Sequence, residues 1–323
     1  MQGGSVVDHQ LLTFVTVAEK KNFTRAAEEL HVTQSAVTLA IKTLEKNYKT
    51  KLLDRTNKYV RLTKAGEILY HHAKEILSRY EKVQRLLDDL IHAASGPLSI
   101  GSSYTFGEYL LPGMIAEFKQ LYPSIIPSVS IRNSKRIISQ LLRHELDLGI
   151  IEGEIQHPEL VIQPFAQDEM VVIVSSSHRL AGVEEVEVEE LLSETWIFRE
   201  QGSGTRQATD RFFEKIGTFP DSTMSFGSSQ IIKGSVEAGL GISILSECAV
   251  RRELYLGTIH TLRIVNHPIT RNYSYAIHNS DFRAKAADLF LHFLCNHDAL
   301  NFISRSEQPG TIAQDSREGR ALL

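Results

Sequence analysis

The chain has little cysteine and no long apolar run, and each shortage excludes a class of protein. Two cysteines in 323 residues, Cys248 and Cys295, cannot build a disulfide framework or a metal site. No apolar run reaches the roughly 18 residues that a membrane helix needs, and the N-terminal residues lack the basic stretch and cleavage site of a secretory signal. We therefore expect a cytoplasmic protein in a reducing compartment.

The net charge of −4 is distributed unevenly along the chain. Residues 1–64 carry a net charge of +5, residues 65–95 carry −1, and residues 96–323 carry −8. A basic end on an acidic body is typical of a protein in which one part binds nucleic acid and the other binds something else. A chain of this length predicts two or three domains.

Two short helices joined by a turn are predicted in the stretch FTRAAEELHVTQSAVTLAIKTLE, residues 23–45. Thr24 is expected to cap the first helix and Thr33 the second. Small alanines where the helices cross favour a helix-turn-helix, to which residues 8–20 add a third helix. The apolar face of the second helix is expected to hold Ala36, Val37, Ala40, Ile41 and Leu44.

The polar side of this unit has the chemistry of a DNA-binding surface. Residues 42–64 carry eight Lys or Arg side chains against Glu45 and Asp54, and they include two short strands typical of a basic wing. A charge run or a helix pair alone is common on protein surfaces, whereas the combination is much more specific for DNA. The predicted DNA contacts are Thr24, Thr33, Gln34, Ser35, Thr38, Lys42, Arg55, Lys58 and Arg61.

Residues 65–94 show the spacing of one long helix with an apolar stripe. Such a stripe needs a partner helix, and the simplest partner is a second copy of the chain. Adjacent His71 and His72 point to different faces, which favours helix surface over a metal site. We therefore predict a dimerising linker.

Residues 97–300 alternate apolar strands with helices, which predicts a parallel-rich α/β sheet covered by helices on both faces. Residues 134–153 align without gaps on residues 228–247 and coincide at five positions. This echo indicates two similar half-domains with a cleft between them, where ligands commonly bind.

Four segments of the body open a helix directly after a strand and should reach the rim of this cleft. They contain Ser102–Ser103, Asn133–Ser134, residues 198–206 and residues 227–229. Hydroxyls and free N–H groups at helix starts favour a small anion, to which Arg206, and less strongly Arg132, would add positive charge. Each serine alone could be an ordinary helix cap. The glycines near residue 203 fit neither a P-loop nor a dinucleotide fingerprint.

Residues 8–66 resemble the N-terminal domain of LysR-type transcriptional regulators. The resemblance rests on F-T-R-A-A-E-E-L-H-V-T-Q-S-A-V-T-L-A-I-K-T-L-E, then L-L-D-R and L-T-K-A-G. The rest of the chain is similar to the effector-binding domain of that family, which looks like a periplasmic binding protein. R-E-x-G-S-G-T-R, with N-S and I-E-G earlier, most resembles members that control carbon fixation or sulfite and sulfur metabolism.

Three positions depart from the pattern of the family. Lys49 stands where a Gly is usual, so it either strains the turn or ends the helix differently. Leu53 stands where Phe is common, and Ser228 replaces an Asn often found in that subgroup. The loss of the amide at 228 leaves the identity of the ligand open.

The resemblance implies an architecture and a set of effector contacts. It implies a winged helix-turn-helix at 1–64, a linker helix at 65–95, and an effector domain at 96–300 with subdomain I at about 97–166 and 268–300 and subdomain II at about 167–267. Residues 301–323 are polar and are expected to form a flexible tail. The implied effector contacts are Ser102, Ser103, Asn133, Ser134, Glu152, Ser203, Gly204, Thr205, Arg206 and Ser228.

The implied partners are double-stranded promoter DNA, further copies of the chain in a dimer or tetramer, and RNA polymerase. No cofactor is implied beyond a small anionic effector, either a sulfur oxyanion or another small metabolite. An enzyme is disfavoured because neither G-x-S-x-G nor H-E-x-x-H occurs. A thiol-based redox sensor and an effector-independent repressor stay open as alternatives, although both cysteines sit in apolar stretches and are expected to be buried.

Overall fold

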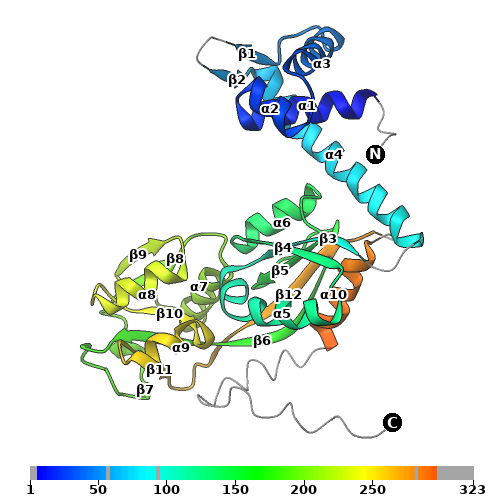
Figure 1. Ribbon diagram of the computed structural model, residues 1–323. Coiled ribbons are helices and arrows are strands. Elements are labelled where there is room, and N and C mark those ends of the chain that lie inside the picture. The colour runs from blue at the N-terminus through cyan, green and yellow to red at the C-terminus, as the bar shows by residue number, and fades with distance from the viewer. Residues whose placement is uncertain (1–5, 56–58, 92–94, 281–282, 297–323) are drawn as a thin grey trace, which may run out of the picture. The chain divides into compact units, whose positions relative to one another are not determined.

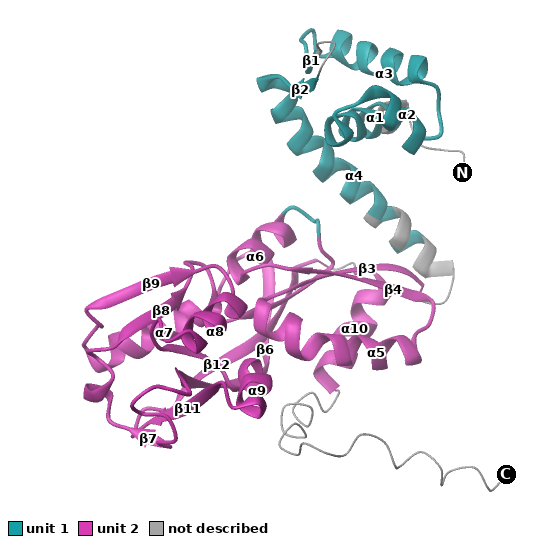
Figure 2. Cartoon of the chain, turned by 60° about the vertical axis from the view of Figure 1, so that its left-hand side comes forward, with its two compact units in different colours: residues 1–91, 143–145 teal, residues 92–142, 146–323 magenta. Residues whose placement is uncertain are grey.

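The computed structural model describes residues 6–55, 59–91, 95–280 and 283–296 (Figure 1). Contacts divide the chain into two compact units, of which the first comprises residues 1–91 and 143–145 and the second comprises the remainder (Figure 2). None of the helices in the described ranges is long and apolar enough to span a membrane. The expected tail at 301–323 lies outside these ranges.

The first unit packs three helices against a small hairpin and the start of a fourth, longer helix. Its core consists of buried apolar side chains such as Phe14, Ile41 and Leu44. The elements are α1 (Val6–Lys20), α2 (Phe23–Glu29), α3 (Gln34–Asn47), the antiparallel pair β1 (Leu53–Arg55) and β2 (Val60–Leu62), and α4 (Lys64–Ile91).

The residue that caps α3 is the one predicted from the sequence, whereas the residue that caps α2 is a different one. Thr33 caps α3 by accepting a hydrogen bond from the backbone N–H of Ala36 at 3.2 Å. The cap of α2 is Asn22, whose Oδ1 accepts from the N–H of Thr24 at 2.8 Å. The prediction that Thr24 is the cap was wrong, because the helix begins at Phe23, two residues earlier than a cap at Thr24 would allow, and the side-chain oxygen of Asn22 accepts from its free N–H groups.

The buried face of α3 is narrower than predicted. Val37, Ile41 and Leu44 are buried, but Ala36 is exposed and Ala40 is half-buried. Ala36 lies in the first turn of the helix, where the core of the unit does not cover it. The fourth buried residue of the helix is charged: it is Glu45, which the sequence analysis considered only in the charge balance of residues 42–64.

Lys49 adopts the left-handed conformation that glycine has at helix ends, with φ of 53°. The helix still closes in the usual way, since the N–H of Thr50 reaches the carbonyl of Glu45 at 3.1 Å and the N–H of Lys49 reaches that of Lys46 at 3.2 Å. The sequence left open whether Lys49 strains the turn or ends the helix differently. The structure keeps the usual helix end, with Lys49 in a strained conformation.

The apolar stripe of α4 divides between two faces. Ala73 is fully buried in the core of the first unit, and Leu69 packs against that core. The side chains of Ile68, Ile76 and Leu87 are 60%, 48% and 52% exposed. The first unit therefore covers only part of the stripe.

The second unit is built on an eight-stranded sheet of mixed direction. The strand order is β4-β3-β5-β12-β6-β11-β7, with β10 also paired to β6. The strands are β3 (Gly96–Ser102), β4 (Ile125–Ile131), β5 (Leu148–Glu152), β6 (Leu160–Ser175), β7 (Glu185–Val186), β10 (Ser243–Ser246), β11 (Ile259–Ile264) and β12 (Ile269–His278), and β8 (Thr195–Arg199) and β9 (Ser222–Phe226) form a separate parallel pair.

The prediction of a parallel-rich sheet holds for β3, β4 and β5 but is wrong at the centre. There β6 and β12 are long and antiparallel, with pairing from Leu160 opposite His278 to Met170 opposite Ile269. The helices are the π-turn Phe106–Leu110, α5 (Leu111–Leu121), α6 (Ser134–Leu142), the 3₁₀ turn Val188–Glu190, α7 (Gly204–Ile216), α8 (Ser229–Glu237), α9 (Glu247–Leu256) and α10 (Lys285–Asn296).

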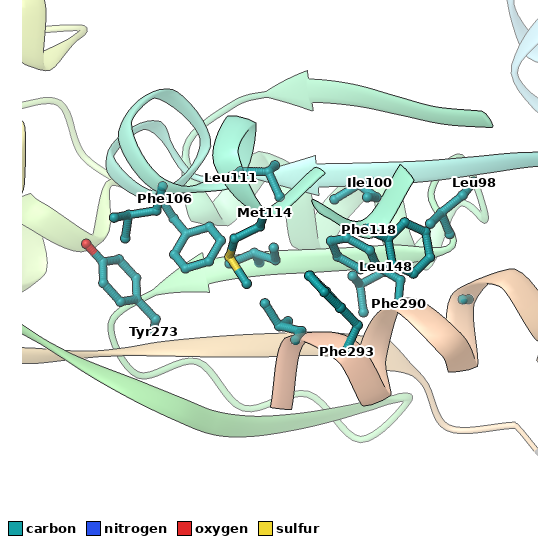
Figure 3. Packing of buried hydrophobic residues seen from close by; sticks show 14 of the residues in the cluster. Leu98, Ile100, Phe106, Leu111, Met114, Phe118, Leu148, Tyr273, Phe290 and Phe293 are labelled. Atoms are coloured by element: carbon teal, nitrogen blue, oxygen red, sulfur yellow. The ribbon is translucent and has the colours of Figure 1, made fainter. Parts of the chain in front are cut away.

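Separate apolar clusters lie on the two sides of this unit. One contains Phe106, Phe118 and Phe290, and Figure 3 shows these rings together with Met114 between the helices and the sheet. The rings of Phe118 and Phe290 meet edge to face, with their centroids 5.0 Å apart. The other is built around Trp196, whose ring centroid is 5.0 Å from that of Phe213. Strands β6 and β12 contribute residues to both clusters, so they join the two halves of the unit.

Candidate effector site and nucleic-acid interface

The exposed start of α3 carries the predicted groove-facing residues. Gln34, Ser35 and Lys42 are exposed, and Thr38 is half-buried. Positions 34, 35, 38 and 42 follow helical spacing, so they share one face of α3. Ser35 Oγ lies 2.9 Å from Thr33 Oγ1, which restrains its hydroxyl at the helix start. Exposed Leu39, which the sequence did not select, lies beside them.

The hairpin adds positive charge beside α3. Arg61 is exposed, and its guanidinium carbon is 4.5 Å from the ring centroid of Tyr59. The Arg55 backbone belongs to β1, but its side chain and the whole of Lys58 lie outside what the structure describes. Glu45 fixes the hairpin to α3, because its Oε1 accepts from the N–H of Leu52 at 3.0 Å.

In the second unit, Arg199 joins three of the four segments predicted to reach the cleft. Its side chain is 1% exposed. Its guanidinium carbon lies 4.7 Å from the ring centroid of Tyr104, and its Nη1 donates to Ser229 Oγ at 3.1 Å. Its Nε donates to Glu200 Oε2 at 2.8 Å. A buried guanidinium therefore lies where the segments around residues 104, 200 and 229 meet.

The remaining segment, around Asn133, contacts the loop that follows Arg199. Asn133 Nδ2 donates to Glu200 Oε1 at 3.2 Å, and the N–H of Lys135 donates to the carbonyl of Gly202 at 3.2 Å. A Cβ on Gly204 would lie 2.4 Å from the Cβ of Glu152, so only glycine fits there. The two halves of the unit are in close contact at these points.

Arg271 is buried at the centre of a second network. It donates from Nη1 to Glu152 Oε2 at 2.5 Å and to Thr205 Oγ1 at 2.7 Å, and from Nε to Asp168 Oδ2 at 2.7 Å. Its Nη2 donates to Thr105 Oγ1 at 2.9 Å. Burial raises the pKa of Asp168, and the positive charge of Arg271 opposes that shift. Glu152 and Thr205, which the sequence assigned to an effector, are thus held by an internal cation.

The predicted serines have different surroundings. Ser102 Oγ donates to the carbonyl of Ser103, while Ser134 Oγ donates to the carbonyl of Glu152 at 3.0 Å. Ser228 caps α8 by accepting from the N–H of Ile231 at 3.4 Å. Ser103 Oγ is buried and has no hydrogen-bond partner among the described residues. An unpaired buried hydroxyl indicates a place where a ligand or water completes the bonding.

A cavity of about 510 Å³ lies between α6 and α7. Five predicted residues line it: Ser134, Glu152, Ser203, Gly204 and Arg206. Arg206 Nε is 2.7 Å from Asp210 Oδ1, and Arg211 Nη2 is 2.7 Å from Glu154 Oε2. Both cations are therefore already paired. Arg132 is exposed and donates to its neighbour's carbonyl.

Sequence reasoning missed Arg199 and Arg271, which hold these networks together. Both lie in strands whose residues are mostly buried, TWIFR and ITRNYSYAIH. A charged side chain in a strand otherwise destined for burial is the signal that could have found them, because a buried charge requires partners. Which partners it finds depends on segments far away in sequence.

The two cysteines differ in their surroundings. Cys248 is 8% exposed with Sγ 3.1 Å from Ser246 Oγ, and burial together with the nearby Asp168 charge raises its pKa to about 11. Cys295 is exposed, so the expectation that it is buried was wrong. It lies near the end of α10, on the face turned away from Phe290 and Leu294. Across the described ranges no group of His, Cys, Asp and Glu side chains could hold a metal ion.

Two family models match the chain. The LysR substrate binding domain matches residues 92–299, and the bacterial regulatory helix-turn-helix protein of the lysR family matches residues 9–67. The chain belongs to the LysR family. It is a LysR-type transcriptional regulator with a helix-turn-helix and an effector-binding domain, and not an enzyme.

Relatives of this LysR-type chain include regulators of the two groups that its motifs resemble. It is 39% identical to the HTH-type transcriptional regulator CysL of Bacillus subtilis over 82% of this chain and 89% of that protein. It is 34% identical to the RuBisCO operon transcriptional regulator of Acidithiobacillus ferrooxidans over 84% and 87%. The regulatory domain of Synechocystis CcmR, solved in complex with 2-PG, is 30% identical with a TM-score of 0.58, covering 62% of this chain and 96% of that one.

Proposed function

We propose that this regulator binds promoter DNA as a dimer or tetramer and that a small anionic effector, bound between the two halves of the second unit, changes that binding. The observation that carries the proposal is the buried guanidinium of Arg199, at the meeting point of three segments that open helices. A buried cation among helix starts favours an anion.

The predicted contacts divide into two groups under this proposal. Ser102, Ser103, Asn133 and Ser228 lie on the segments around Arg199, and Ser134, Ser203, Gly204 and Arg206 extend from there along the adjoining cavity. Glu152 and Thr205 would support the site from beneath, because Arg271 already binds their oxygens. The unpaired hydroxyl of Ser103 would contact the effector directly.

On the DNA side, α3 would enter the major groove with Gln34, Ser35, Thr38 and Lys42, while Arg55, Lys58 and Arg61 of the hairpin would contact the backbone. Thr24 and Thr33 would bind phosphates near the helix starts. The exposed stripe of α4 would pair with a second copy and set the spacing of two half-sites. Contact with RNA polymerase is implied by the family resemblance alone.

Coupling between effector and DNA needs two arrangements of the chain that the effector distinguishes. Strands β6 and β12 run through both halves of the second unit, so a rotation about them would change how the halves face each other. An effector that binds one arrangement more tightly shifts the population toward it by the difference in affinity. An effector with equal affinity for both would change nothing.

A thermal-shift screen of the full chain tests the effector. The ligands are sulfite, sulfate, thiosulfate, phosphate, acetylserine, phosphoenolpyruvate and 2-PG, because a ligand that binds only the folded state raises the melting temperature with concentration. We expect a rise with one anion that Ser103→Ala and Asn133→Ala reduce. Ser222→Ala, at the far end of β9 from Phe226, is the matched control. No rise with any anion would contradict the proposed effector class.

A further inference from the structure

The carboxylate of Glu200 occupies the donors that an anionic effector would need. Its Oε2 accepts from Arg199 Nε at 2.8 Å, and its Oε1 accepts from Arg199 Nη2 at 3.1 Å and from Asn133 Nδ2 at 3.2 Å. Arg199 is therefore bound in a two-point arrangement by its own neighbour in sequence. Two-point binding of a carboxylate combines two charge-assisted hydrogen bonds, each of which is stronger than a hydrogen bond between neutral groups.

The two members of this ion pair differ in their exposure to solvent. The side chain of Arg199 is 1% exposed, whereas that of Glu200 is 28% exposed. Arg199 is held in place by Ser229, the carbonyl of Gly227 and the ring of Tyr104. The contacts of the Glu200 carboxylate are made with Arg199 and Asn133. The cation is thus fixed, and the anion is the member that can leave toward water.

We infer that Glu200 is a built-in counter-anion, which occupies the anion position at Arg199 until an effector displaces it. The inference rests on the proposed function. In the exchange, the effector takes over the hydrogen bonds from Arg199 and Asn133, and the Glu200 carboxylate becomes solvated. No buried charge is left without a partner at either end of the exchange, which keeps its cost low.

This arrangement sets which anions can act. A tethered carboxylate has a high effective concentration at Arg199, so a free monoanion with the same contacts competes poorly. An effector needs a second charge or an additional contact, for which the unpaired hydroxyl of Ser103 is one source. The site would therefore select dianions such as phosphate esters and sulfur oxyanions over chloride or acetate. Glu200 is a specificity-determining residue of the effector site in this account.

Glu200→Gln tests the inference, because the amide keeps an oxygen for Arg199 but loses the charge. The probes are inorganic sulfate and inorganic phosphate, titrated by calorimetry into the full chain at constant ionic strength. The affinity of the variant for sulfate should rise at least about tenfold over that of the native chain, because a like charge no longer competes for the same guanidinium. Glu189→Gln, an exposed position in the 3₁₀ turn, makes the same change in net charge away from Arg199 and should leave the affinity unchanged.

The outcomes separate this inference from the proposed function. Unchanged or weaker sulfate affinity in Glu200→Gln overturns the inference, even where the ligand screen on the native chain has found an effector. An equal gain in Glu189→Gln also overturns it, because the effect would then be general electrostatics. A gain confined to position 200 supports it, even where every ligand in the screen fails. Should Glu200→Gln not fold, Glu200→Asp, which is too short to span both donors, must also gain affinity for sulfate.

Discussion

Arg271 Nη1 lies 2.5 Å from Glu152 Oε2, and both side chains are buried where β12 passes β5. The same guanidinium reaches the hydroxyls of Thr105 and Thr205, which begin helical segments on opposite sides of the second unit. One cation therefore ties together the strands shared by the two halves and the segments that open onto the candidate site.

Arg271→Met should lower the free energy of unfolding by about 3–5 kcal/mol, because it leaves Glu152 and Asp168 buried without their cation. Urea unfolding followed by the fluorescence of buried Trp196 measures the change. Arg263→Met is the control, since that side chain is 65% exposed and its loss should cost less than about 1 kcal/mol. Equal losses in the two variants would contradict the central role of Arg271.

Lys49→Gly should stabilise the first unit by about 1 kcal/mol, because glycine adopts a positive φ without the strain that a side chain brings. Calorimetry of the full chain should show a higher melting temperature. Lys46→Gly, three residues earlier in the last turn of α3, should instead lower stability by about 1 kcal/mol. A loss of stability at both positions would mean that the conformation of Lys49 imposes no strain.

Native labelling with iodoacetamide should modify Cys295 well before Cys248. With a pKa of about 11, Cys248 is a thiolate in only about one molecule per thousand at pH 8, and its reactive fraction should rise about tenfold per pH unit. The site of labelling is read by mass spectrometry after proteolysis. Rapid, oxidant-sensitive labelling of Cys248 at pH 8 would contradict its burial and support a thiol-based sensor.

Two substitutions on α3 should affect DNA binding differently. Gln34→Ala should reduce binding to a sequence selected by the native chain without changing binding to random DNA. Lys42→Ala should weaken both and reduce the slope of affinity against salt by about one. Fluorescence anisotropy at several salt concentrations measures both effects, with Lys215→Ala in α7 of the second unit as the control. Binding like that of the native chain in both variants would contradict the proposed docking.

Local sequence patterns predicted many of the helices and strands, but they did not always identify the residue at which a helix begins. Thr33 caps α3 as predicted, whereas α2 uses Asn22 instead of Thr24, since either side chain could serve and only the path of the chain decides. The pattern of strands and helices in residues 97–152 was also predicted. The antiparallel centre of the sheet was not, because strand direction depends on how β12 returns from the far end of the chain.

The candidate site also combines features that local sequence signals predict with features that only the tertiary structure sets. Serines and glycines at helix starts are local signals, and three of the residues that the sequence selected in this way, Ser134, Ser203 and Gly204, line the cavity between α6 and α7. It also determined the family and the basic N-terminal unit, because those depend on motifs and composition. Only the tertiary structure decided that Arg199 pairs with Glu200 and Arg271 with Glu152. The partner of a buried charge is whichever group the fold brings within hydrogen-bonding distance, and no local pattern encodes that distance.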